Sequence, residues 1–121
     1  MIKGVKFVTI PVRDQKKALA FWTEKLGFQV FTDQPFNDQQ RWVELGIPGA
    51  PTRVVPFLLD GWEDRIGKFL NVVFYSDNVE KTYQELTSKG VEFLAPPKKE
   101  DWGTSCIFKD QDGNQFVLSS K

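Results

Sequence analysis

The sequence offers few side chains that could do chemistry, because its 121 residues include no histidine. This excludes a Ser–His–Asp triad and every metal site built on imidazole. The one cysteine, Cys106, falls in a predicted strand with no visible base or positive neighbour that would activate it as a nucleophile, so we expect an inert, buried thiol. No glycine-rich phosphate loop is present. The remaining candidate for acid–base chemistry is Glu44.

Glu44 lies in the segment WVEL, which has the composition of a strand. Two interpretations of this carboxylate stay open. In the first, it accepts a hydrogen bond from a ligand, or acts as a general base whose pKa an aromatic pocket raises. In the second, it pairs with a nearby basic residue, either Arg41 or Arg53.

Aromatic residues are unusually frequent, with 11 Phe, 4 Trp and 2 Tyr. Strand alternation puts Trp42 on the same side as Glu44, and Trp102 comes just before a predicted strand in the second half. These two rings could stack on a flat or cationic ligand, or they could fill the interior of the protein. Trp22 lies on the apolar face of the first predicted helix, where we expect it to be part of the core.

Charge and hydropathy exclude several classes of partner. The chain has 16 basic and 16 acidic residues, a balance that does not favour a nucleic acid or an anionic membrane surface. No segment approaches the ~20 consecutive apolar residues of a membrane span, and the first residues do not resemble a signal peptide. A single cysteine allows no intrachain disulfide. We expect a cytoplasmic protein.

The first half of the chain, residues 1–60, predicts a strand, a helix and three strands. Asp14 is a typical N-cap and Gly27 a typical end of the helix. Between them the apolar residues recur at helical spacing. The strands are predicted over residues 5–12, 28–32, 41–45 and 53–59.

The pattern restarts after a polar connector, residues 61–68. Asp77 or Asn78 caps a second helix that ends at Gly90, and Asp77 to Gly90 spans the same 13 residues as Asp14 to Gly27. Strands are predicted over residues 70–75, 91–94, 104–109 and 115–119, with a loop at 95–101. Residues 110–114, DQDGN, have calcium-like spacing of acidic and amide groups but lack the rest of an EF-hand loop, which favours a hairpin turn.

Both halves therefore predict an α+β fold of two βαβββ modules, residues 1–60 and 69–121, within a single domain. The segment PVRDQKKALAFWTEKLGF resembles the first module of the glyoxalase/bleomycin-resistance/dioxygenase proteins, the vicinal oxygen chelate superfamily. The segments VVFYSDNVEKTYQELTSKGVEF and WGTSCIFKDQDGNQFVL resemble its second module. This resemblance implies a cup-shaped mixed sheet with the helices on the outside.

The resemblance also implies where metal-dependent relatives hold their metal. Two ligands from each module, usually His and Glu, face into the cup. Their positions fall on Phe7, Glu44, Asn71 and Val117 of this chain. Only Glu44 is a strong ligand, whereas a catalytic transition metal needs about three protein ligands. We therefore expect no metal and no other cofactor.

The function that these residues favour is the binding of an aromatic or cationic small molecule in the cup, as in relatives of the bleomycin-resistance type. The expected contacts are Phe7, Thr9, Trp42, Glu44, Asn71, Trp102 and Val117. One alternative is a lyase, isomerase or dioxygenase-like enzyme in which Glu44 serves as acid, base or residual metal ligand. Another is a regulatory subunit whose own aromatic rings fill the cup. Because open sheet edges favour pairing, we expect a homodimer.

Overall fold

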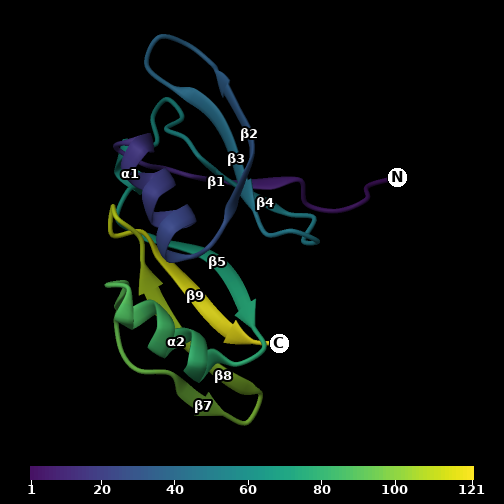
Figure 1. Ribbon diagram of the computed structural model, residues 1–121, viewed down its shortest axis with the longest axis vertical. Helices are drawn as coiled ribbons and strands as arrows, with labels where there is room; N and C mark the ends of the chain where they lie inside the picture. Colours follow the sequence, from purple (N-terminus) through teal and green to yellow (C-terminus); the bar gives the residue numbers. More distant parts are fainter. The chain divides into compact units, whose positions relative to one another are not determined.

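The computed structural model describes all 121 residues, which divide into two compact units, residues 1–66 and 67–121. The division falls inside the polar connector. Figure 1 follows the first unit from purple to teal and the second from teal to yellow. Each unit holds one mixed sheet with an α-helix, which confirms the predicted α+β class and the two βαβββ modules.

The first unit forms a four-stranded sheet in the order β1-β4-β3-β2. β1 pairs with β4 in parallel, and the other neighbours are antiparallel. Parallel pairing of β1 and β4 requires a long crossover, which the helix and the β2–β3 hairpin supply. The bounds are β1 Phe7–Ile10, α1 Gln15–Ala20, the π-helical turn Phe21–Lys25, β2 Gln29–Pro35, β3 Arg41–Gly46 and β4 Arg53–Pro56, and a 3-10 turn, Glu63–Arg65, follows.

The first helix begins and ends where its residues predict. The Asp14 carboxylate accepts hydrogen bonds from the backbone N–H groups of Lys16 and Lys17, and Gly27 has a φ of 77° that few other residues adopt. The helix packs against β4. Trp22 is fully buried, with Phe21 and Phe28 in edge-to-face contact with its ring, so its predicted place in the core is confirmed.

The second unit forms a five-stranded sheet, β5-β9-β8-β6, with β7 added beside β8. β5 and β9 are parallel, and α2 packs against both. Asn78, rather than Asp77, caps α2 by accepting from the backbone N–H of Lys81. The bounds are β5 Phe69–Ser76, α2 Val79–Ser88, β6 Glu92–Phe93, β7 Lys98–Glu100, β8 Gly103–Lys109 and β9 Gln115–Ser120.

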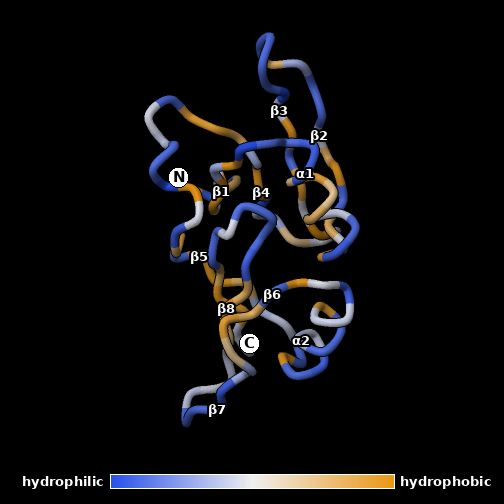
Figure 2. Tube along the Cα trace, turned by 90° about the vertical axis from the view of Figure 1, so that its left-hand side faces the viewer, coloured by the Kyte–Doolittle hydropathy of each residue, from blue (hydrophilic) through white to orange (hydrophobic).

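The expectation of a loop over residues 95–101 is wrong, because β7 lies there. Glu100 pairs with Gly103, so Asp101 and Trp102 form a two-residue turn between β7 and β8. The segment is strongly polar, and Figure 2 shows it in the hydrophilic colours. Its lysines gave it the composition of a loop, yet charged residues are common on edge strands, where they discourage further pairing.

The DQDGN segment folds as the predicted turn between β8 and β9. Asp110 is buried, and its carboxylate accepts from the backbone N–H groups of Asp112 and Asn114 and from the Asn114 side-chain amide. The Asn114 side-chain oxygen in turn accepts from the backbone N–H of Gly67. These bonds use the Asp110 carboxylate to hold the turn closed. No helix in the structure is long and apolar enough to span a membrane.

Asp110 makes the stability of the fold depend on pH. Burial raises its pKa from 3.8 to about 6, against the opposing effect of the hydrogen bonds from Asn114 and Asp112. The folded protein therefore holds this proton more tightly than the unfolded chain does, and the stability that the proton contributes is present at pH 4 and is lost as the pH rises through 6. The full effect is on the order of 3 kcal/mol.

Urea unfolding of the protein and of an Asp110→Asn variant between pH 4 and 7 tests this. The difference in unfolding free energy, wild type minus variant, should fall as the pH rises, since the other carboxylates contribute equally to both proteins. A difference that stays flat or rises would contradict the raised pKa.

Candidate functional site

The Glu44 carboxylate accepts two hydrogen bonds that use both of its oxygens. Oε2 accepts from the indole Nε1–H of Trp42 and Oε1 from Nη1–H of Arg53, each at 2.9 Å. The side chain is only 11% exposed. Charge-assisted hydrogen bonds of this kind are stronger than neutral ones, so the three side chains hold one another in place. We call Trp42, Glu44 and Arg53 the polar triad.

The register of the sheet brings the polar triad together. Residues 42 and 44 share one face of β3 because successive side chains alternate. Leu45 pairs with Val54 across β3 and β4, so Arg53 lies beside Gly46. Gly46 is two residues from Glu44 and is the next residue on the same face of β3. A Cβ at Gly46 would lie 3.5 Å from Cγ of Arg53 and 3.2 Å from the Phe31 ring. The missing side chain therefore leaves room for Arg53 and Phe31.

The Trp42 ring belongs to an aromatic cluster on the same face. Its centroid lies 5.4 Å from that of Phe7, 5.4 Å from that of Phe57 and 6.1 Å from that of Phe36. Edge-to-face pairs at such distances are favourable beyond the burial of their area. Phe36 is 58% exposed and Trp42 is half-buried, so the cluster reaches the surface. We call Phe7, Phe36, Trp42 and Phe57 the aromatic cluster.

Four of the predicted site residues thus share one face of the first sheet. Phe7 pairs with Arg53, and Thr9 with Val55, across the parallel β1–β4 ladder. This places Phe7 and Thr9 on the face that carries Trp42 and Glu44. Phe31, Phe36 and Phe57 lie around the same residues but were not predicted. The register of β3 and β4 is what reveals Phe57, because it puts this ring beside Trp42.

Of the two interpretations left open for Glu44, the general base with a raised pKa is not supported. The Trp42 N–H bond and the Arg53 guanidinium lower the pKa below 4.5, with a smaller contribution from Lys6, and they outweigh the effect of burial. The carboxylate is therefore ionised at neutral pH and is a weak base. The alternative interpretation, an ion pair with Arg53, is confirmed.

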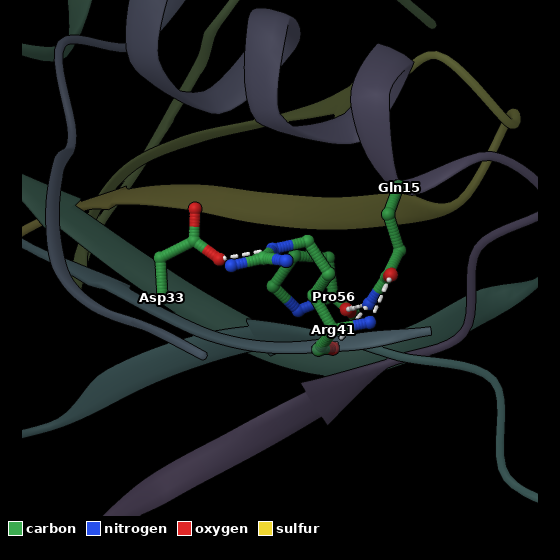
Figure 3. Close-up of polar contacts among 4 residues, drawn as sticks. All are labelled: Gln15, Asp33, Arg41 and Pro56. Carbon is green, nitrogen blue, oxygen red and sulfur yellow. Dashed lines mark hydrogen bonds and ion pairs between the residues drawn. The ribbon is translucent and has the colours of Figure 1, made fainter. Parts of the chain in front are cut away.

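Arg41, the other basic residue considered as a partner, binds elsewhere. Its Nε lies 2.6 Å from the Asp33 carboxylate. The neighbouring backbone of β3 is held by Gln15, whose side-chain amide donates to the carbonyls of Arg41 and Pro56 and accepts from the N–H of Arg41. Figure 3 shows this arrangement. Arg41 and Trp42 are adjacent on β3 and so face opposite sides of the sheet.

The other predicted residues, Asn71, Trp102 and Val117, belong to the second unit. Val117 pairs with Val73 of β5 and Ile107 of β8. Asn71 has a φ of 58°, at a point where the register of β5 against β9 shifts. Trp102 is 67% exposed at the β7–β8 turn, so it does not fill the interior. It lies five positions from Ile107, or about 17 Å along the strand, and is not beside Val117.

The donors at the superfamily's metal positions do not fit a metal. Phe7 and Val117 offer no ligand atom, Asn71 offers an amide, and both oxygens of Glu44 are engaged by Trp42 and Arg53. No group of three or more Cys, Asp or Glu side chains is placed to hold an ion.

Cys106 is buried in β8 and faces the interior of the second unit. Burial, and to a smaller extent the charge of Glu80, raises the pKa of its thiol to about 11. The thiolate is the nucleophilic form, so a cysteine of this pKa is unreactive near neutral pH. The expectation of an inert thiol is confirmed.

Comparisons with known proteins assign the fold to a family. Residues 4–118 match the Glyoxalase/Bleomycin resistance protein/Dioxygenase superfamily. The Bacillus subtilis protein YetH is 40% identical over 121 residues, which cover 98% of both chains. A Sphaerobacter thermophilus member of this superfamily has a crystal structure that is 35% identical, covers 99% of this chain and 98% of its own, and superposes with a TM-score of 0.89.

A second similar structure is that of TnmS3, an antibiotic binding protein from Streptomyces sp. CB03234. It is 32% identical, with a TM-score of 0.83 and coverage of 98% of this chain and 96% of its own. The chain therefore belongs to the glyoxalase/bleomycin resistance/dioxygenase superfamily, as its two module sequences indicated.

The polar triad should contribute measurably to stability. A Glu44→Ala variant leaves the Arg53 guanidinium and the Trp42 N–H without their acceptor in a poorly exposed place. We expect a loss of about 2 kcal/mol of unfolding free energy. Urea denaturation measures it.

Glu92→Ala is the matched control. Glu92 pairs with Lys109 at 3.0 Å, but its side chain is 68% exposed. An exposed pair of this kind contributes roughly 0–1 kcal/mol. Equal losses in the two variants would show that the polar triad is no stronger than a surface ion pair.

Proposed function

We propose that this protein binds a small molecule that carries an aromatic ring, and that the ring packs on the aromatic cluster of the first unit. The observation that carries the proposal is the fixed, half-buried ring of Trp42. Its N–H donates to Glu44, and its ring makes T-shaped contacts with Phe7 and Phe57, yet the cluster still reaches the surface. A ring that is already immobilised loses little entropy when a ligand stacks on it.

The similarity to TnmS3 supports the same class of function, because that protein binds an antibiotic. Binding here needs no metal, since the donors present suit none. Thr9 adds a hydroxyl on the same face as Phe7. Contributions from Asn71, Trp102 and Val117, and the homodimer, remain predictions.

The geometry does not favour the enzymatic alternative. A general base must have a free oxygen near the proton that it removes and a pKa near the working pH. Glu44 has two engaged oxygens and a lowered pKa. Its role in this proposal is to hold Trp42 and Arg53 in place.

Nitrogen-15 NMR of the tryptophan indole N–H groups tests the proposal. The Trp42 resonance is identified by its absence in Trp42→Phe. Titration with naphthamide, an uncharged naphthalene amide, should shift this resonance to saturation. Calorimetry should show binding about tenfold weaker in Trp42→Leu, which corresponds to a single aromatic stacking contact.

Trp62→Phe is the control, because Trp62 contacts Arg65 and lies outside the aromatic cluster. It should bind like the wild type. A Trp42 resonance that does not move with naphthalene amide or its charged analogues would overturn the proposed function.

A further inference from the structure

Arg53 is held in one orientation by two contacts of different kinds. Its Nη1–H donates to Glu44, and its guanidinium carbon lies 4.6 Å from the centroid of the Phe31 ring. A guanidinium stacked on an aromatic face is both attracted to the ring and shielded from water on that side. The plane of the Arg53 guanidinium is therefore fixed before any ligand binds.

Most N–H donors of the Arg53 guanidinium are not used within the protein. A guanidinium carries five N–H donors, and the Arg53 side chain donates one hydrogen bond, to Glu44. The side chain is 35% exposed, so water reaches its other donors. Both oxygens of the Glu44 carboxylate are used, whereas Arg53 keeps N–H donors that no protein acceptor uses.

The charges near Arg53 also favour an anionic ligand over a cationic one. The charges that act on Glu44 are those of Arg53 and Lys6, both positive. Lys6 is held next to Arg53, whose backbone N–H donates to the Lys6 carbonyl at 3.0 Å. Since Glu44 neutralises only one of these two cations, the charges near Arg53 favour an anionic ligand. A cationic ligand would be repelled there.

The aromatic cluster begins directly beside the fork. Phe7 is the β-ladder partner of Arg53, and neighbouring strands lie about 4.8 Å apart. A flat ligand could therefore stack on the cluster and reach the Arg53 fork with a substituent on the same ring. Bidentate pairing with a planar oxygen pair is the geometry that a guanidinium recognises best.

We propose that the ligands of this face are acidic aromatic molecules, in which a carboxylate or a similar oxyanion on the ring pairs with Arg53. The inference rests on the proposed function and narrows it. It replaces the aromatic or cationic ligand expected from sequence with an aromatic anion. Arg53 is the residue that determines this specificity.

Three probes with the same ring and different charges test the inference. Naphthoate is an anion, naphthamide is neutral and naphthylmethylammonium is a cation. We expect naphthoate to bind at least about tenfold more tightly than either of the others, the gain typical of one charge-assisted hydrogen-bonding pair. The shift of the Trp42 indole resonance gives each dissociation constant.

Variants of Arg53 should remove this preference without removing binding. In Arg53→Gln, naphthoate should bind no better than naphthamide, and in Arg53→Lys the preference should be reduced because the fork is lost while the charge stays. Arg41→Gln is the matched control, since Arg41 is also ion-paired on a strand of this sheet but faces the other side. It should keep the full preference.

A double variant, Glu44→Gln with Arg53→Gln, covers the case in which Arg53→Gln unfolds because Glu44 is left unpaired. The amide carbonyl introduced by Glu44→Gln can still accept from Trp42, and the double variant should bind naphthoate no better than naphthamide. Equal affinity of the wild type for all three probes, or a preference that survives in the double variant, would overturn the inference and leave the proposed function standing. Absence of any Trp42 shift would instead overturn the proposed function itself.

Discussion

The two hydrogen bonds accepted by Glu44 are the constraint on which the rest of the site depends. They fix the tilt of the Trp42 ring and the plane of the Arg53 guanidinium, and these two groups carry the proposed binding of ring and anion. The bonds exist because β3 puts residues 42 and 44 on one face and pairs with β4 in a register that brings Arg53 alongside. Gly46 leaves the space that Arg53 and Phe31 occupy.

The same constraint bears on whether Glu44 could bind a metal ion. The resemblance to metal-dependent relatives places a ligand position at Glu44, and in this structure the Glu44 carboxylate is paired with Arg53 and accepts a hydrogen bond from the Trp42 indole. A carboxylate held this way by protein donors has little left to offer an ion, and a phenyl ring at residue 7 offers nothing. In the proposed function Glu44 therefore supports Trp42 and Arg53, and the neighbouring rings supply the apolar surface that an organic molecule would contact.

Local sequence signals predicted most helices and strands, whereas the arrangement of the site depends on how distant strands pair, above all β3 with β4. Asp14, Gly27 and Gly90 marked the helix ends correctly because capping depends on residues within one turn. Strand alternation placed Trp42 on the same face as Glu44, because it too depends only on residues close in sequence. The β7 strand was missed because its lysines are typical of loops. The role of Glu44 stayed open because the choice between a ligand, Arg41 and Arg53 as its partner depends on how β3 meets β4. The loop between those strands, GIPGAP, does not specify that register.

The most direct measurement is the ionisation of Glu44 itself, followed by carbon-13 NMR of the carboxyl group during an acid titration and assigned with Glu44→Gln. The account predicts a midpoint below 4.5, because Trp42 and Arg53 stabilise the carboxylate, and a simultaneous shift of the Trp42 indole resonance when the proton binds. A midpoint above 4.5, or a Trp42 resonance indifferent to the titration, would contradict the claim that Glu44 organises this face.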